Sequence, residues 1–302
     1  MVAQFVTFSL FSSLLQFGSK SWIAGLALLA LSALAGAEPA AAQTAAETPS
    51  AGKEPGATAA GKQPIEVTAE GGIEWDRNAQ TYTARGNAHA QRGDLSVNAD
   101  TLVAHYRKAE TGNSQIFSLE ATGNVRLRSQ SAAVTGDHAV YDVTTRVMTV
   151  TGKNLKLETG TDTVTARDRL EYSDAKHQAS AYGAVTVVRQ GQRLDAEQVV
   201  ATLVPDSEGK LAISKAEASG NVRIATQREF IRADHGTYDA DKQLAVLTGG
   251  VKVTQDQNQL NGEYAEVDLK TGVSRLLGAP PGTAGGQVKG LVLPESVPQP
   301  GG

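Results

Sequence analysis

The sequence predicts an all-β fold made of serial antiparallel strand repeats, and three observations support this. Glycines recur at positions 86, 123, 152, 183, 220 and 249, each in a stretch of alternating apolar residues, which is typical of a repeat array. Nine of the ten prolines lie outside residues 65–279, so almost nothing there would break a sheet ladder. Short polar segments such as 144–146 join neighbouring stretches, which favours antiparallel pairing. About fourteen strands are expected.

A longer period of 97 residues overlies the glycine spacing. It pairs Asn124 with Asn221, Arg126 with Arg223, Asp137 with Asp234, His138 with His235, Tyr141 with Tyr238 and Asp142 with Asp239. Six identities in one register are not expected by chance. They indicate that a block of three repeat units has been duplicated.

The stretches through the glycines have one apolar face and one polar face, because side chains alternate along a strand. Arg126 and Arg223 are expected on the polar face. The glycines are expected on the apolar face, where they would bend or bulge the strand or leave room in the interior. Around Gly152 the alternation slips by one residue, which suggests a β-bulge. Candidate ligand-contacting residues of the apolar face are Leu119, Val125, Leu127, Val150, Val185, Val187, Val222, Ile224, Leu247, Val251 and Val253.

A second type of strand carries an acid followed four residues later by a tyrosine. The pairs are Asp137 with Tyr141, Asp168 with Tyr172, and Asp234 with Tyr238. An even spacing places acid and ring on the same face, which we expect to be the polar one. A structural role for these pairs is favoured over a binding role.

Composition excludes several classes of function. The 302 residues include 32 acids, 28 bases and no cysteine, and the net charge of −4 does not favour nucleic-acid binding. No nucleophile elbow, zinc-binding His-Glu-x-x-His or P-loop is found. The five histidines are dispersed along the chain. We therefore expect no enzyme activity, no metal site and no cofactor.

The N-terminal region resembles an export signal. Lys20 precedes an apolar run over residues 22–35 and small residues that end at Ala42, so residues 1–42 are predicted to be a cleaved signal peptide. Retention of this region as a membrane anchor is the alternative. Residues 43–62 are expected to form a flexible leader, 63–277 the β domain and 278–302 a Gly/Pro-rich tail, in which 288–293 could add a short strand.

Three segments carry a resemblance to a known family. Residues 63–67, 83–88 and 95–100 read QPIEV, TARGNA and LSVNAD. They resemble the first strands of the LptA/OstA-like family of periplasmic lipopolysaccharide transport proteins, and the later Gly-Asn-Val and Ala-Asp-x-x-x-Tyr segments recur there too. The resemblance covers about residues 63–277, and the repeat region is longer here than in the simplest members.

The resemblance implies a twisted, V-shaped open β-jellyroll in the periplasm. Its apolar interior would shield the lipid A acyl chains of lipopolysaccharide. The protein would bridge inner-membrane and outer-membrane components of the same transport system, alone or as a head-to-tail homo-oligomer. Ile65 and Val67 are the positions implied to contact ligand and the preceding component. Two alternatives stay open: a structural β-repeat scaffold of the envelope, and a membrane-anchored sister component of the system.

Overall fold

The computed structural model describes residues 65–108, 114–205 and 211–291, and its regular elements in those ranges are all β-strands. The predicted signal peptide and leader, residues 1–42 and 43–62, lie outside the described ranges. No helix that could cross a membrane occurs in the described part of the chain. The strands are β1 (Glu66–Thr68), β2 (Ile73–Asp76), β3 (Thr81–Arg92), β4 (Leu95–Lys108), β5 (Ser114–Arg128), β6 (Ala132–Asp142), β7 (Val147–Thr151), β8 (Leu155–Thr159), β9 (Asp162–Ala166), β10 (Arg169–Ser173), β11 (Gln178–Arg189), β12 (Gln192–Pro205), β13 (Leu211–Ala225), β14 (Glu229–Asp239), β15 (Leu244–Gln255), β16 (Asn258–Asp268), β17 (Val273–Leu277) and β18 (Lys289–Leu291).

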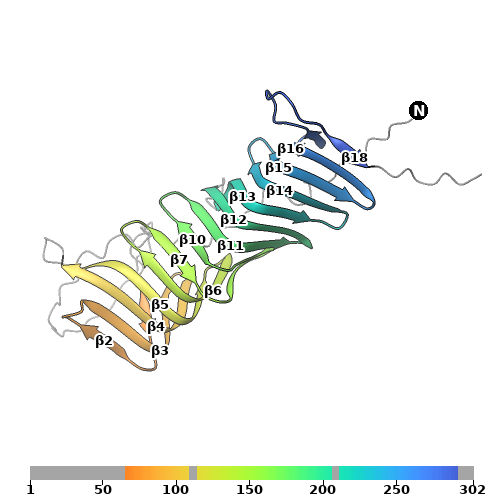
Figure 1. The fold of residues 1–302 in the computed structure, drawn as a ribbon. Helices are drawn as coiled ribbons and strands as arrows, with labels where there is room; N and C mark the ends of the chain where they lie inside the picture. Colours follow the sequence, from red (N-terminus) through yellow and green to blue (C-terminus); the bar gives the residue numbers. More distant parts are fainter. Residues whose placement is uncertain (1–64, 109–113, 206–210, 292–302) are drawn as a thin grey trace, which may run out of the picture.

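Neighbouring strands in the chain are also neighbours in space, so the molecule is a long stack that runs from β2 to β18 (Figure 1). All pairings are antiparallel, as predicted, and join each strand to the next from β3 to β6 and from β11 to β16. We call each crossing of the stack by the chain a pass. Most passes are one long strand, but four of them consist of two short strands: β1 and β2, β7 and β8, β9 and β10, and β17 and β18. The structure therefore has eighteen strands, more than the fourteen or so expected from the sequence, and the excess comes from these four split passes.

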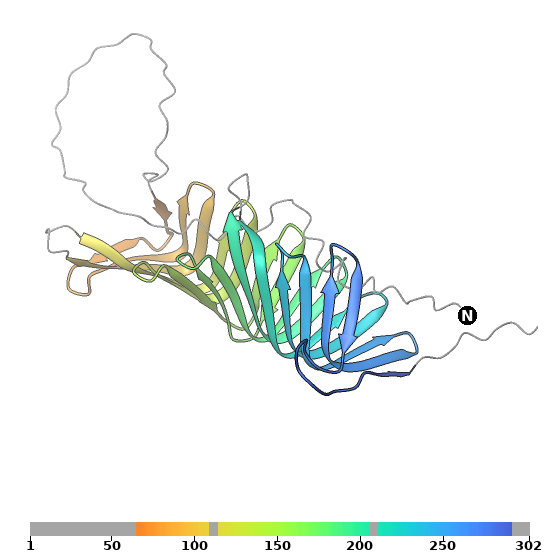
Figure 2. The ribbon, with the colours of Figure 1, turned by 90° about the horizontal axis from the view of Figure 1, so that it is seen from above.

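Each pass turns a corner, which divides the stack into two limbs. Limb A contains β1, β8, β9, β18 and one half of each long strand, such as residues 125–128 of β5. Limb B contains β2, β7, β10, β17 and the other halves, such as residues 114–122 of β5. Figure 2 shows the two sets of strands diverging at the C-terminal end of the molecule. The enclosed side between the limbs is called the interior below.

The corner is built from the recurring glycines. Gly123 and Asn124 have φ values of 80° and 48°, and they form a β-bulge where the pairing of β5 with β6 shifts register. Positive φ favours glycine because it has no Cβ. A Cβ at Gly123 would collide with the carboxylate of Asp100 on the neighbouring strand. The predicted bend and bulge are therefore confirmed, but the expectation that these glycines leave room in the interior is wrong.

An acid lies beside each bulge or interruption and forms part of the corner. The Asn124 side chain donates to Asp100 at 3.0 Å, and the backbone N–H of Gly250 donates to Glu263 at 3.1 Å. These carboxylates satisfy donors that the bulge withdraws from the ladder. The corner acids of this kind are Glu70, Asp100, Asp137, Asp168, Glu197, Asp234 and Glu263.

The corner also changes the alternation of the acid-bearing strands. On β6, Gly136 pairs with Val125 and His138 pairs with Thr122, so Asp137 lies opposite the two bulged residues. Inward positions before and after Asp137 are therefore separated by three residues instead of two or four. Tyr141 is buried in the interior although Asp137 is exposed. The prediction that acid and ring share the polar face is wrong, because it assumed an unbroken period of two.

The interruption at Gly152 is larger than the predicted bulge. Thr151 pairs with His138, and Lys156 pairs with Thr135. Four residues, 152–155, therefore lie opposite only two residues of β6, 136 and 137. The chain leaves the ladder between β7 and β8. A Cβ at Gly152 would meet Asp137, which shows the same acid-at-corner arrangement despite the break.

The strand bounds show the duplication clearly. Adding 97 to the bounds of β3, β4, β5 and β6 gives those of β11, β12, β13 and β14. We call residues 66–161 the first repeat and residues 162–258 the second repeat. The hydrophobic core also forms two clusters, but they do not divide at the repeat boundary: the first extends from Ala99 of β4 into the second repeat as far as Leu211, and the other lies on β12 to β16.

Candidate functional site

The interior between the limbs collects most of the side chains predicted to contact a ligand. Nine of them are buried there: Val125, Leu127, Val150, Val185, Val222, Ile224, Leu247, Val251 and Val253. Leu119 and Val187 are partly buried against the same core. Ile65 and Val67 are 37% and 38% exposed at the N-terminal end of the stack. The structure thus joins eleven of the thirteen residues in one apolar interior.

Burial is close to complete beside the corner, where Val125, Val150, Val185, Val222 and Val251 are only 1% or 2% exposed. Farther from the corner it varies: Leu203 is 1% exposed, whereas Val187 is partly buried. An apolar ligand would therefore first meet the partly buried side chains such as Val187.

Sequence reasoning missed the half of the interior that the acid-bearing strands supply. Tyr141 and Tyr172 are buried, and Val97, Leu102 and Leu194 are partly buried against the core clusters. At each corner acid the inward positions are separated by three residues, so a strict alternation of two assigns the residues beyond the acid to the wrong face. Treating the acid as a break in the alternation would have revealed them.

Apolar side chains are also exposed at both ends of the stack. At the N-terminal end, Ile73 and Trp75 of β2 are exposed, Trp75 stacks on Tyr82 at 5.6 Å, and its indole N–H donates to the Tyr106 hydroxyl at 2.8 Å. At the C-terminal end, Leu291 is 62% exposed on β18. Within the described ranges, the short strands at these ends leave backbone groups without a strand partner, so both ends could accept another chain.

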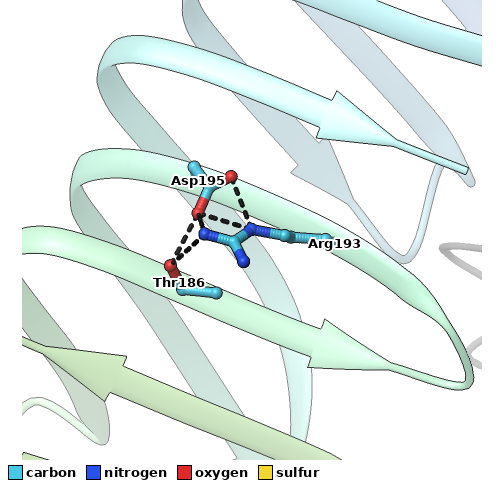
Figure 3. A network of polar contacts seen from close by, with 3 residues as sticks. All are labelled: Thr186, Arg193 and Asp195. Carbon is cyan, nitrogen blue, oxygen red and sulfur yellow. Dashed lines mark hydrogen bonds and ion pairs between the residues drawn. The ribbon is translucent and has the colours of Figure 1, made fainter.

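The outer face of limb A is polar, and its second-repeat part carries a compact charged network. Arg193 donates through Nε to Asp195 at 2.7 Å, and the Thr186 hydroxyl donates to Asp195 at 2.6 Å (Figure 3). These hydrogen bonds, with Arg193 contributing most, lower the pKa of Asp195. In the first repeat the same outward positions hold His89 and Asn98, whose side chains lie 2.9 Å apart.

The outer face of limb B carries a smaller polar cluster. The His138 Nε2 atom lies 2.8 Å from Glu120, and His105 lies 3.5 Å from the same carboxylate. The hydrogen bond from His138 is the main cause of the lowered pKa of Glu120. Neither this cluster nor any other group of three or more His, Cys, Asp or Glu residues in the described part of the chain has an arrangement that could hold a metal ion.

A buried polar cluster lies on limb B near the junction of the two repeats. Arg146 donates through Nε to Asp174 at 2.8 Å, and Asp174 is itself buried. The hydroxyls of Tyr141 and Tyr172 are buried beside this pair with no hydrogen-bond partner among the described residues. Burial, with a smaller contribution from Asp174, raises the pKa of Tyr172 to about 12, and burial also raises the pKa of Tyr141. Both hydroxyls therefore stay neutral, and the two rings contribute apolar surface.

The rim of limb A in the second repeat is polar although it faces the interior. Gln192 and Glu229 are only 9% and 8% exposed, and burial raises the pKa of Glu229 to about 7. Beside them, Arg189 Nε lies 3.3 Å from Asp162. The first repeat keeps an arginine at the equivalent of Arg189, Arg92, but has Leu95 and Ala132 in place of Gln192 and Glu229, so these two polar side chains belong to the second repeat alone.

Comparison with known proteins agrees with the repeat structure. The model of the family described as "LptA/(LptD N-terminal domain) LPS transport protein" matches the chain twice, over residues 66–168 and 164–273. The two matches begin 98 residues apart, close to the 97-residue period, and together cover more than half of the chain.

Among solved structures, the chain is similar to LptH from Pseudomonas aeruginosa, titled the LptA homologous periplasmic component of the conserved lipopolysaccharide transport device. The two are 12% identical, with 77% of this chain and 96% of that chain covered and a TM-score of 0.20. No curated protein sequence matches this one.

Proposed function

Because the chain belongs to the family of LptA and the LptD N-terminal domain, whose members are lipopolysaccharide transport proteins, we propose that it is a periplasmic bridge protein. It binds lipopolysaccharide and shields the lipid A acyl chains in the interior between its limbs. In this way it carries the glycolipid from the inner toward the outer membrane for outer-membrane assembly.

The observation that carries the proposal is an apolar interior that runs through both repeats. Leu127 and Ile224 occupy equivalent positions 97 residues apart, and both are buried there. The partly buried residues Leu119 on limb B and Val187 on limb A supply more accessible apolar surface. An acyl chain could therefore stay in contact with apolar side chains along the stack.

Energetics explain why such an interior is needed. Transfer of a methylene group out of water is worth about 0.8 kcal/mol, so an acyl chain of about twelve carbons costs roughly 10 kcal/mol when it is exposed. A protein that offers equivalent apolar surface at successive positions lowers this barrier. It supplies no energy for directional movement, which must come from other components.

The two ends of the stack fit the role of a bridge. The exposed apolar residues of β2 at one end and of β18 at the other lie next to strand edges that could pair with another sheet. We propose that these ends contact the inner-membrane and outer-membrane components or further copies of the chain. Head-to-tail joining of unlike ends extends into a filament and does not close.

A matched pair of substitutions tests lipid binding in the interior. Val187 is partly buried inside, and its neighbour Val188 is 37% exposed on the outer face. Val187→Arg places a charge in the interior and should weaken lipopolysaccharide binding at least tenfold, since an unpaired charge is costly to bury. Val188→Arg should change binding less than about twofold. Equal effects of the two substitutions would contradict the proposal.

One observation favours a second function, that of an envelope scaffold with a packed interior. The valines beside the corner are almost completely buried, which a dry core would also explain. A scaffold should show no lipopolysaccharide binding in either the unaltered chain or the Val188→Arg variant. Binding by both, with loss in Val187→Arg, would exclude the scaffold.

Export with cleavage after Ala42 is part of the proposal. A membrane-anchored sister component would keep residues 1–42, which lie outside the described ranges. Mass spectrometry of the exported protein distinguishes the two, because cleavage removes about 42 residues. An intact N-terminus would support the anchored alternative.

A further inference from the structure

We infer that limb A of the second repeat carries a hydrogen-bonding subsite for the hydroxyl and amide N–H groups of an acylated sugar. The side chains that would contact the ligand are Gln192 and Glu229, and Thr226 holds the turn beside them, its hydroxyl accepting from the Glu229 backbone N–H at 3.1 Å. The three residues are called the rim subsite. The inference rests on the proposed function, because it assigns an end of the acylated ligand to one place in the interior.

Strand register brings the three residues together. Arg193 of β12 pairs with Ala225 of β13, which pairs with Phe230 of β14. Gln192 precedes Arg193, Thr226 follows Ala225 and Glu229 precedes Phe230, so these three residues lie side by side at the same end of the three strands. The backbone N–H of Thr226 donates to the Glu229 carbonyl at 2.9 Å, which fixes this end of the hairpin.

Alternation points the Gln192 and Glu229 side chains toward the interior. Gln192 has the same parity as Leu194 and Ala196 on β12, and Glu229 has the same parity as Ile231 and Ala233 on β14. All four of these apolar residues are buried or packed against the core. The two polar side chains therefore continue the apolar rows to the rim.

One polar atom of the rim subsite lacks a partner among the described residues, whereas the Thr226 hydroxyl already bonds backbone groups of Arg228 and Glu229. The Gln192 Oε1 atom is buried and accepts no hydrogen bond in the structure. Glu229 is 8% exposed, and no hydrogen bond to its carboxyl is found among the described residues, but its carboxyl oxygens are not fully buried, so the Gln192 oxygen is the buried unsatisfied group. An unsatisfied buried polar group costs about 1–3 kcal/mol, and such groups are rare in native proteins. A bound ligand with matching donors would remove this cost.

The chemistry of the rim subsite favours a neutral hydrogen-bond donor. Gln192 offers a carbonyl oxygen, and Glu229, whose pKa burial raises to about 7, can accept or donate near neutral pH. Arg189, opposite Gln192 on β11, is 3.3 Å from Asp162, so its charge is already balanced. A phosphate would face the Glu229 and Asp162 carboxylates, whereas a hydroxyl or an amide N–H would not be repelled.

The first repeat provides the contrast that makes the subsite specific. In place of Gln192 and Glu229 it has Leu95 and Ala132, which are apolar, although Ser129 takes the place of Thr226 and Arg92 that of Arg189. An acyl chain can be accommodated along both repeats, but the junction between chain and sugar finds these two polar side chains only in the second. The ligand would therefore be held with its sugar end at the rim of limb A there.

Two probes with the same acyl chain test the subsite. One is N-dodecanoyl glucosamine, which has an amide N–H and hydroxyls; the other is methyl dodecanoate, which has no donor. Binding of both is measured with the full exported chain and with the double variant Gln192→Leu/Glu229→Ala, which carries the residues of the first repeat. The outer-face variant Glu217→Ala is the matched control, because Glu217 is exposed.

The rim subsite predicts that the double variant binds the acyl sugar about 5- to 30-fold more weakly, as expected for two lost hydrogen bonds, and binds the ester within about twofold of the unaltered chain. The ratio of the two affinities is independent of the folded fraction. Equal weakening for both probes, or no change for either, would overturn the subsite while leaving the proposed function standing. If the unaltered chain bound neither probe, the proposed function would fail and the subsite with it.

Discussion

The first and second repeats have the same strand bounds shifted by 97 residues from β3 to β6 and from β11 to β14, yet their polar groups differ. Both have the glycine corner with an acid on the neighbouring strand, Gly123 with Asp100 and Gly220 with Glu197. At the rim and on the outer face of limb A, however, apolar or neutral residues of the first repeat correspond to charged and amide groups of the second. The corner thus defines the architecture, and the rim distinguishes the two copies.

The comparison predicts the largest effect at the shared corners. Gly123→Ala and Gly220→Ala should each lower the free energy of unfolding by about 2–5 kcal/mol, because positive φ disfavours a Cβ and the Cβ would collide with the neighbouring acid. Gly191→Ala is the control: its φ is also 80°, but nothing lies within 4 Å of the added Cβ. It should cost only about 1–2 kcal/mol. Chemical denaturation measures all three.

Removing equivalent buried side chains from the two repeats should lower the free energy of unfolding by similar amounts. Val125 and Val222 are 1% and 2% exposed at positions 97 residues apart. Substitution of either by alanine should destabilise the protein by about 1–3 kcal/mol, whereas Val188→Ala on the outer face should change stability by less than about 0.5 kcal/mol. A difference of more than about 2 kcal/mol between Val125→Ala and Val222→Ala would show that the repeats are packed differently.

Glu229 should make stability depend on pH in a way that Ala132 of the first repeat cannot. Burial raises its pKa in the folded state from 4.5 to about 7, so the folded protein binds this proton more tightly than the unfolded chain. Its contribution is most favourable below the unfolded pKa and is lost as pH rises to about 7, with a total on the order of 1–3 kcal/mol.

Thermal unfolding of the unaltered chain and of Glu229→Ala at about pH 5 and about pH 8 measures this contribution. The loss of stability on raising the pH should be smaller in the variant. An equal pH dependence in both proteins would mean that Glu229 is not held in an apolar environment.

The smallest effect is expected on the outer face. Asp195→Asn replaces the carboxylate that Arg193 and Thr186 contact with the residue type found at Asn98 of the first repeat. Because Arg193 is largely exposed, the loss should be below about 1 kcal/mol and should shrink at high salt. The lowered pKa of Asp195 means that this stabilisation is present above the unfolded pKa and is lost as pH falls. Denaturation at two salt concentrations measures it, and a loss that salt leaves unchanged would contradict a screened surface pair.

The sequence predicted the architecture because the signals are local. Positive φ at a bulge favours glycine, so Gly123 and its equivalents mark each corner, and the short strand β18 lies within residues 288–293, the segment considered for an additional strand. Burial of Leu127 and Ile224 follows directly from a period of two that the glycine strands keep across the bulge.

Other features could not be predicted because they depend on the partner strand. The inward position of Tyr141 results from the extra residue on β5 opposite Asp137, which the sequence of β6 does not show. The polar rim was missed for a related reason: Gln192 and Glu229 are polar residues at inward positions, and sequence patterning assigns such residues to the outside. Only the register across β12 to β14 brings them together.

A crosslinking comparison at equivalent neighbours tests the account most directly. A photoreactive residue is placed in turn at Leu127 and Ile224, which face the interior, and at Arg126 and Arg223, which are exposed on the outer face. In cells that make lipopolysaccharide, the account predicts capture of lipopolysaccharide from Leu127 and Ile224 and little from the two arginine positions. Capture from Arg126 and Arg223 alone would contradict it.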